Sequence, residues 1–427
     1  MDYYWCSSTV IKTSVQYILE YVKNNDLIVY GGFAIHLFLQ DRTGYGIYDP
    51  VRSVPDIDVY SSNFVEDAKK MVSYLEGVGY RDVYASRALF PFTVRLWIGG
   101  VCVCDITHLQ SSTVKKVDPT RTKQGVLVCG GLYLQSELLI DLATPFVYSS
   151  VLKRRKKIKE RFDTLVDASS THHPVVVPAA PSFHQKTVAC FVDSQESWCF
   201  YGMSAFAILN AMFYSDFSID PPSDSSAVYI PEVIYHKDSR TITFKGVDQI
   251  EWLTDGVIVP YDAVTARRPS YGNAVPQEYS FPISSYVASS ETTNSNITVT
   301  GYCYLSKQLL ASRTDDGVRV VNVYTLMLYF IMKFYDTGSD IYLIWYRHCL
   351  HMARRVEETV EKTNDKELER KLVLSPLYLN LETIGSDFKN VYNLIGNAFV
   401  WPTKYTSSDS PEKTFDISKN PLFEPRR

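Results

Sequence analysis

Residues 27–58 contain the feature that most restricts how this chain can fold. An apolar run, Leu27–Tyr30, is followed directly by Gly31-Gly32, after which apolar residues resume at Phe33. The pattern predicts a buried strand, a tight turn and a short helix, because glycine lets a turn pass close to another group. After a loop the chain reaches Asp56-Ile57-Asp58, in which two carboxylates flank one isoleucine.

Asp56 and Asp58 form a candidate cation site. Side chains two positions apart in a strand point to the same face, so both acids project together while Ile57 and Val59 face the core. Two adjacent carboxylates repel each other unless a cation neutralises them. Mg²⁺ suits this pair because it takes hard oxygen ligands, commonly one or two carboxylates together with substrate phosphates. The alternative is a strand edge or a turn after Pro55, since an Asp-x-Asp sequence alone is common.

A third acid, Asp105, lies near the end of the apolar run Val101–Ile106. Regular alternation places Asp105 on the opposite face from Cys102 and Cys104, and a neighbouring strand would bring it beside the acidic pair. Three carboxylates can hold two metal ions roughly 3.5–4 Å apart, one activating a hydroxyl and one stabilising the leaving pyrophosphate. The order of strand, Gly-Gly turn, helix, acidic pair and third acid therefore predicts a nucleotidyltransferase.

The composition is that of a globular protein with two domains or three. Its 427 residues are 46% hydrophobic and 21% charged, and single cores stop growing beyond about 250–300 residues. The net charge of −4 provides no overall basic field, so nucleic-acid binding would need local basic patches. Eight scattered cysteines without a Cys-x-x-Cys pair favour a reducing compartment.

Membrane insertion and secretion are not expected. The N-terminus lacks the basic start and apolar core of a signal peptide. The longest apolar stretch, Val320–Met332, is interrupted by Asn322 and Thr325 and is shorter than the ~20 apolar residues that cross a bilayer. We therefore expect a soluble, intracellular protein that is not secreted.

The pattern along the chain predicts a mixed α/β (α+β) fold in two parts. The expected helices are 8–23, 34–39, 63–77 with a capping box at Asn63 and Glu66, 138–166, 198–213 and 322–372. The expected strands are 27–30, 82–86, 90–98 and 101–107, and then 227–235, 240–245, 256–260 and 297–305. Residues 167–182 have the Pro-rich composition of a linker between domains, and the residues after Trp401 that of an extended tail.

An internal similarity connects the two parts. Tyr30–Leu37 and Tyr201–Ile208 share the character of a strand, a turn and a helix. No Asp-x-Asp strand follows the second copy, so a duplication would have left one copy without its acids. Repeats this short also arise by chance.

Two groups of titratable residues remain open. The run Lys153–Arg161 is strongly basic, and on a helix it forms either a solvated face or a surface that contacts phosphates, through Lys153, Arg154, Arg155 and Lys156. His348 and His351 could share a helix face, but no acid or third ligand accompanies them, so packing is the preferred interpretation. His172-His173 lies in the expected linker, where no metal role is expected.

Residues 27–109 resemble the poly(A) polymerases of large cytoplasmic DNA viruses, of the asfarvirus and mimivirus kind, and more distantly the poxvirus catalytic subunit. The residues that carry the resemblance are Leu27–Ile35, Pro55–Ser61, Asn63–Ala68 and Cys104-Asp105-Ile106. It extends through Ile140-Asp141-Leu142 and the basic helix, and it becomes thin after Ser182, although Tyr201–Leu209 fits the family's second half.

The resemblance implies an enzyme that adds AMP from ATP to RNA 3′ ends, with Mg²⁺ or Mn²⁺. Asp56, Asp58 and Asp105 match the family's catalytic, metal-binding acids, and Gly31, Gly32 and Phe33 its ATP-binding turn. Residues 1–170 would be the catalytic domain, 183–400 a degenerate nucleotidyltransferase-like domain, and 401–427 the tail. The giant-virus branch implies a homodimer, in the host cytoplasm (the virus factory) or the virion.

Two other functions stay open from the residues. The chain could be a template-independent nucleotidyltransferase that adds a different nucleotide or makes a short product. It could also be a non-catalytic RNA-binding scaffold that retains the fold. The presence of all three acids argues against the scaffold, because an inactive copy usually loses them.

Overall fold

A computed structural model describes most of the N-terminal half of the chain and the framework of the rest. The described residues are 9–49, 55–88, 93–109, 114, 117–143, 152–169, 198–200, 202–217, 232–236, 249–253, 281–290, 295–304, 311–314, 319–381 and 404–405. The strands predicted at 240–245 and 256–260, the histidines 172–173 and most of the expected linker lie outside these residues.

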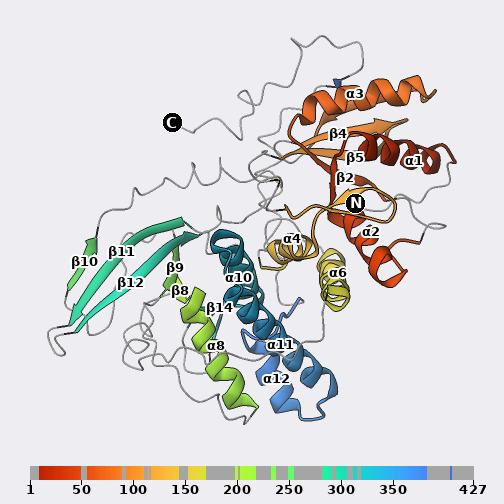
Figure 1. Ribbon diagram of the computed structural model, residues 1–427. Helices are drawn as coiled ribbons and strands as arrows, with labels where there is room; N and C mark the ends of the chain where they lie inside the picture. The colour runs from red at the N-terminus through yellow and green to blue at the C-terminus, as the bar shows by residue number, and fades with distance from the viewer. Residues whose placement is uncertain are drawn as a thin grey trace.

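The first half folds around an eight-stranded mixed sheet (Figure 1). Its elements are α1 (Thr9–Asn24), β1 (Ile28–Tyr30), α2 (Gly31–Thr43), β2 (Ile57–Ser61), α3 (Phe64–Gly77), β3 (Val83–Arg87), β4 (Thr93–Ile98), β5 (Val101–His108), β6 (Thr120–Arg121), β7 (Leu127–Val128), α4 (Gly131–Ala143) and α6 (Leu152–Ser169). The strand order is β15-β3-β4-β5-β2-β1-β7-β6, where β15 (Lys404–Tyr405) lies in the predicted tail and pairs with the edge strand β3.

The second half has its own seven-stranded sheet and four helices among the described residues. Its elements are β8 (Trp198–Phe200), α8 (Gly202–Asp216), β9 (Glu232–His236), β10 (Gln249–Leu253), β11 (Phe281–Ser290), β12 (Ser295–Tyr304), β13 (Ala311–Arg313), β14 (Arg319–Val321), α10 (Val323–Thr337), α11 (Ile341–Lys362) and α12 (Lys366–Leu374). The strand order is β10-β11-β12-β9-β8-β14-β13.

The two sheets have the same topology, strand for strand. The order β3-β4-β5-β2-β1-β7-β6 corresponds to β10-β11-β12-β9-β8-β14-β13. Every neighbouring pair also has the same direction: β2/β5 and β9/β12 are parallel, as are β1/β7 and β8/β14, and the remaining pairs are antiparallel. In each half a glycine with positive φ, Gly31 or Gly202, joins the central strand to a helix. The predicted second copy is therefore present in the fold.

Several element ends differ from the predictions for local reasons. Helix α2 continues to Thr43 because Gly44, with φ +81°, provides a left-handed C-terminal cap and donates its N–H to Gln40. The capping box at Asn63 is wrong, because the Asn63 side chain makes no capping hydrogen bond. Residues 198–200 form a strand that pairs with β9, so the helix predicted from Trp198 begins only at Gly202.

The expected single helix and the linker after it are also corrected. The helix predicted over residues 138–166 is divided between α4, which starts earlier at Gly131, and α6. Because α6 runs to Ser169, the first residues of the predicted linker are helical. The predicted limits of the domains, 1–170 and 183–400, stay a prediction.

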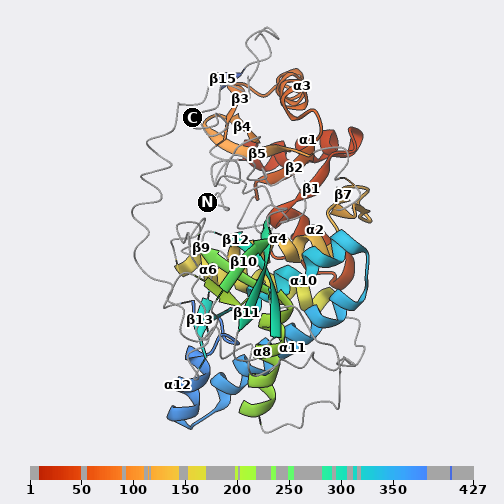
Figure 2. The same ribbon diagram turned by 90° about the vertical axis from the view of Figure 1, so that its left-hand side faces the viewer.

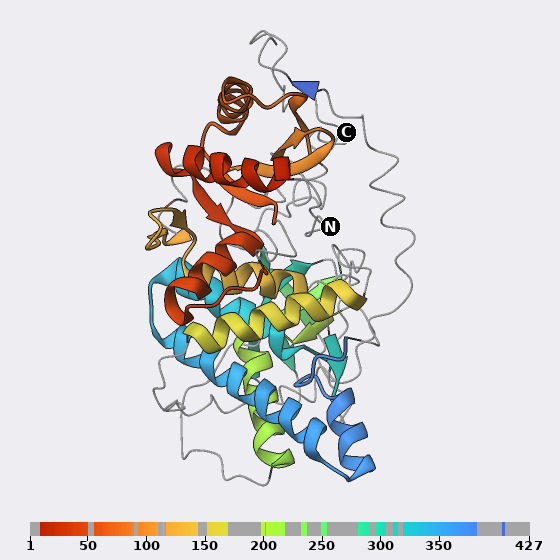
Figure 3. The same ribbon diagram turned by 90° about the vertical axis from the view of Figure 1, so that its right-hand side faces the viewer.

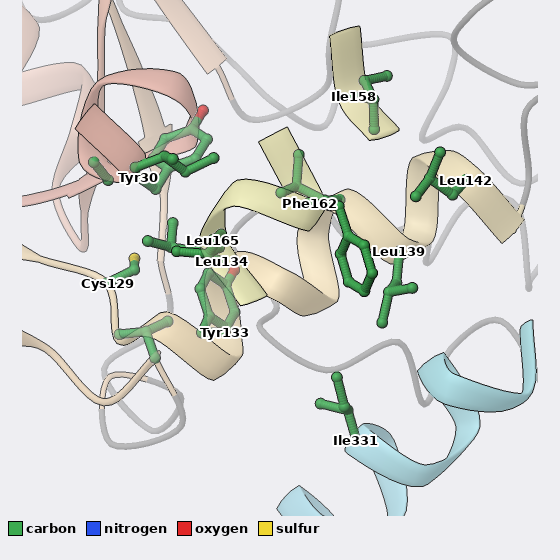
Figure 4. Packing of buried hydrophobic residues seen from close by; sticks show 14 of the residues in the cluster. Tyr30, Cys129, Tyr133, Leu134, Leu139, Leu142, Ile158, Phe162, Leu165 and Ile331 are labelled. Carbon is green, nitrogen blue, oxygen red and sulfur yellow. The ribbon is translucent and has the colours of Figure 1, made fainter. Parts of the chain in front are cut away.

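A continuous apolar core joins the two halves. Helix α4 packs against α6 and α10, and α10 packs against α11. Helices α4 and α6 lie between the first sheet and the C-terminal helices (Figures 2 and 3). Leu139 of α4, Phe162 of α6 and Ile331 of α10 point toward one another in this core (Figure 4). All three side chains are fully buried, so each half covers apolar surface of the other. Among the described residues, no helix has the length and apolar character needed to span a membrane.

Candidate active site

The turn between β1 and α2 brings backbone and carboxylate together. Gly31 has φ +66°, a conformation that side chains disfavour, and Tyr30 before it is extended. A Cβ atom on Gly31 would lie only 2.7 Å from Oδ2 of Asp58. The Asp58 carboxylate therefore lies directly against the start of α2, and glycine is required there both for conformation and for space.

The sheet register places the second acid beside the third. Strand β2 runs parallel to β5 with Asp58 opposite Asp105, and antiparallel to β1 with Asp58 opposite Tyr30. Asp56 precedes β2, and the burial of Ile57 and Val59 confirms that these residues face the core. Asp56 and Asp58 are themselves partly exposed.

The three carboxylates lie close enough to two thiols of β5 to change their pKa values. Burial raises the pKa values of the Cys102 and Cys104 thiols above the usual value of a thiol. The charge of Asp105 makes the next largest contribution to this rise for both thiols. Asp56 and Asp58 also raise the pKa of each thiol. All three predicted acids thus act on the same two buried groups.

A β-bulge in β5 changes the predicted orientation of one cysteine. Cys104 pairs with Leu96 and Cys102 with Trp97, so Val103 is an extra residue in this strand. The alternation predicted for this strand is therefore interrupted. The Cys102 thiol lies 3.8 Å from Oδ1 of Asp105 and donates to it, so the prediction that Cys102 faces away from this acid is wrong.

Asp105 is held by an arginine that the sequence did not single out. Arg95 of β4 lies opposite Asp105, and its Nε and Nη2 atoms donate to the two carboxylate oxygens at 2.8 and 2.6 Å. The exposed fraction of the Asp105 side chain is 9%. Among the residues that the structure describes, no three acidic, His or Cys side chains are already arranged as a metal site. The carboxylate oxygens suit Mg²⁺ or Mn²⁺, but a cation at Asp105 has to compete with the Arg95 guanidinium.

The guanidinium of Arg161 lies at Gly32, the other glycine of the turn. A Cβ atom on Gly32 would lie 2.3 Å from the Tyr48 hydroxyl oxygen and 3.0 Å from Nη1 of Arg161. Arg161, on α6, donates from Nη2 to the Tyr48 oxygen at 3.0 Å. The guanidinium is therefore fixed next to the start of α2, where backbone N–H groups attract anions. Phe33, the third residue predicted to contact ATP, is buried in the core and stacks with His36.

A half-buried carboxyl group of α4 lies against the same turn. Glu137 of α4 accepts hydrogen bonds from the Gly31 N–H and from the Tyr60 hydroxyl, the latter at 2.8 Å. Tyr60 also hydrogen-bonds Tyr133 at 2.9 Å and stacks on Tyr30, with ring centroids 3.9 Å apart. Burial raises the pKa of Glu137 from 4.5 to about 8. Sequence reasoning missed this residue, because a lone acid in an apolar helix forms no motif.

Of the four basic residues predicted to contact phosphate, Arg155 does not lie on the surface. Arg155 is buried, with an exposed fraction of 6%, and donates from Nη1 to the carbonyl oxygen of Leu381 at 3.0 Å. This contact makes Arg155 an anchor between the two halves instead of a surface residue. Arg154 is half-buried, Lys156 is exposed, and the side chain of Lys153 lies outside the described part of the structure.

The histidine pair in α11 is part of the aromatic core. His348 Nε2 lies 2.6 Å from Oδ1 of Asn210, and its ring stacks with that of His351. Burial lowers the pKa of His348 to about 4, which keeps the ring neutral. The prediction of packing instead of metal binding is therefore supported by the contacts of both rings.

Comparison with known proteins places this site in a family. Residues 16–148, which contain the turn and the three acids, match the family model of the poly(A) polymerase catalytic subunit. The part of the chain that carries the site is therefore similar to the viral poly(A) polymerases. Two candidate poly(A) polymerase catalytic subunits of African swine fever virus, from a tick isolate of Malawi and a warthog isolate of Namibia, are each 24% identical to it over 386 residues. These matches cover 88% of this chain and 78% of each relative.

The fold has a solved counterpart in another large virus. The crystal structure of the Megavirus polyadenylate synthase superposes with a TM-score of 0.61 and covers 94% of this chain and 82% of that protein. The sequence identity is 15%, so this likeness describes the fold. It spans both halves, and the predicted mixed α/β fold in two parts is confirmed.

Proposed function

We propose that the protein adds AMP from ATP to RNA 3′ ends without a template, at the site formed by Gly31, Asp58 and Asp105. The observation that carries the proposal is the position of Asp58, against Gly31 and opposite Asp105 in the paired strands β2 and β5. This arrangement brings carboxylates to a helix N-terminus. The carboxylates can bind a cation and the helix N-terminus can bind phosphates, so a nucleoside triphosphate and its cation can share the site.

Each residue of the site has a defined task. Asp56, Asp58 and Asp105 would hold Mg²⁺ or Mn²⁺, which supplies positive charge to the phosphates and lowers the pKa of the attacking hydroxyl. The N–H groups at the start of α2 bind the triphosphate, and Gly31 and Gly32 admit it to the backbone. The position of Arg161 beside Gly32 supports a contact between its guanidinium and phosphate oxygens.

A primer-extension assay with each of the four NTPs tests the function. We expect A-tails from ATP, and an at least ~100-fold loss of rate for Asp58→Asn, because even residues behind a metal ligand change metal affinity or activity 10–100-fold. Asp26→Asn is the matched control, since Asp26 is exposed and pairs with Arg121 away from the site.

Other products would select the other functions. Incorporation of a different nucleotide would make the chain another nucleotidyltransferase. No incorporation of any nucleotide, together with RNA binding, would favour a scaffold.

The resemblance to the giant-virus branch also supports a homodimer that acts in the host cytoplasm or the virion. Light scattering of the purified chain tests the dimer, and a monomer at micromolar concentration would contradict it.

A further inference from the structure

Glu137 lies where its own charge interacts with charge at the Gly31-Gly32 turn, the proposed ATP site. It accepts the N–H of Gly31, the first residue of α2, while Asp58 lies against the same residue from the outer side. An ionised Glu137 would place a negative charge in a half-buried setting beside the entering triphosphate, where the repulsion is screened less than in water. The neutral carboxyl keeps one oxygen as an acceptor for Gly31 and can donate its proton to a tyrosine hydroxyl.

We propose that Glu137 takes up a proton when ATP binds, and that the neutral carboxyl then positions the Gly31 turn for the triphosphate. The inference rests on the proposed function, because it names a positioning residue for the same ATP site. ATP binding and protonation favour each other by linkage, so each increases the affinity of the site for the other. ATP should consequently bind more weakly as the pH rises above neutrality.

The surroundings of Glu137 leave it as the group that titrates near pH 8. The groups that interact with it electrostatically are Tyr30 of β1, Tyr60 of β2, Tyr133 and Asp141 of α4, Cys129 before α4, and Tyr335 of α10. Burial raises the pKa of the four phenols and of the Cys129 thiol above their usual values, so these groups stay neutral through pH 9. Figure 4 shows Tyr30, Cys129 and Tyr133 lying close together at one end of the core.

The positioning role can be distinguished from a merely structural one by counting protons. Titration calorimetry of the full chain with ATP and Mg²⁺, without RNA, is performed at pH 8.5 in two buffers that differ in ionisation enthalpy. With a pKa of about 8 in the free protein, about 0.8 proton should be taken up for each ATP bound. The Kd for ATP should rise about tenfold between pH 7 and pH 9.

Variants at and near this position complete the test. Glu137→Gln keeps an acceptor for Gly31, so it should bind ATP with a Kd that is constant within about twofold from pH 7 to pH 9 and without proton uptake. Glu137→Ala removes the acceptor and should weaken binding at every pH. Asp141→Asn, one turn further along α4, should keep the proton uptake.

Each other result overturns the inference. ATP binding without proton uptake, or uptake that persists in Glu137→Gln, would overturn this inference and leave the proposed function intact. The absence of ATP binding by the wild-type chain would overturn both.

Discussion

At the scale of single residues, Glu137 gives the chain a distinct pH dependence of stability. Its pKa is about 8 in the folded protein and near 4.3 in an unfolded chain. Between these values the folded protein holds a proton that the unfolded chain has released, so stability falls as pH rises through this window. Each pKa unit corresponds to about 1.4 kcal/mol as an upper limit.

The isosteric variant Glu137→Gln should remove this dependence. We expect equal melting temperatures for variant and wild type at pH 4.5, and a higher melting temperature for the variant at pH 8.5, where the wild type carries a half-buried charge. Thermal unfolding followed by circular dichroism at the two pH values measures the difference. A variant that is less stable at pH 8.5 would contradict the cause assigned to the pKa shift.

Arg95 should compete with metal for Asp105. Removing the guanidinium in Arg95→Met leaves a nearly buried carboxylate without its ion-pair partner, which typically costs about 3–5 kcal/mol of stability. The same change should tighten Mn²⁺ binding about tenfold or more, because a unit charge at ~4 Å is worth several kcal/mol at a partly buried site. Calorimetry with Mn²⁺ alone, and melting with and without Mn²⁺, measure both effects.

The exposed pair of Arg121 and Asp26 provides the control for this experiment. Arg121→Met removes a guanidinium of the same kind from a carboxylate that is mostly exposed, so Mn²⁺ affinity should not change. Weaker Mn²⁺ binding by Arg95→Met would mean that Arg95 orients Asp105 for the metal instead of competing with it.

At the scale of elements, the sequence predicted what local patterns specify and missed what tertiary pairing specifies. The β1 turn, the acid pair of Asp56 and Asp58, and the strands on either side of Gly99-Gly100 follow from alternation and turn chemistry. The bulge at Val103 and the pairing of Arg95 with Asp105 depend on the register of β4 against β5, which no periodicity reports. Trp198–Phe200 is a strand because β9 and β14 flank it, although its apolar run also suits a helix.

The basic helix α6 illustrates the same limit. Its charges were equally compatible with a solvated face and with phosphate contact, and the structure gives individual residues separate tasks. Lys159 forms ion pairs with Asp163 and with Glu357 of α11, at 2.7 and 3.1 Å, while Arg161 lies at Gly32. Only the position of the partners separates these functions.

Arg155 should therefore stabilise the protein without contributing directly to RNA affinity. Arg155→Met loses the hydrogen bond to Leu381 and leaves this carbonyl without its charged donor, which costs about 1–3 kcal/mol. We expect a lower melting temperature and, below it, unchanged RNA affinity in filter binding at two salt concentrations. A reduced salt dependence of RNA binding in the variant would instead indicate that Arg155 contacts RNA phosphates.

At the scale of the whole molecule, the duplication explains why one half carries the acids. With Gly31 matched to Gly202, the pair of Val29 and Val59 corresponds to the pair of Phe200 and Val233, so Asp58 corresponds to Glu232. Asp58 lies opposite Asp105 and Glu232 opposite Thr300, so Asp105 corresponds to Thr300. Two residues before Glu232 the chain has Ile230, where the first copy has Asp56. The second copy thus keeps one acid of three and cannot assemble the same cation site.

The second half still stabilises the first through the shared core. Leu139 and Phe162 are covered by Ile331 of α10, and Tyr346 of α11 donates to Gln135 of α4 at 2.6 Å. Cutting the core between these helices would expose apolar surface on both sides, so the halves should unfold together. Ile331→Ala should lower the melting temperature, because truncating a fully buried isoleucine costs about 2–5 kcal/mol.

Calorimetric unfolding with and without ATP distinguishes one cooperative unit from two. If the halves unfold together, a single transition should move upward with ATP and Mg²⁺, since a ligand stabilises every part of a cooperative unit that binds it. Ile331→Ala should lower the melting temperature of this whole transition, although Ile331 lies in the half that does not contain Asp56, Asp58 and Asp105. Independent halves would give two transitions, of which ATP would move one and Ile331→Ala the other. Two such transitions would show that the acid-poor copy is a separate domain and not a support for the catalytic one.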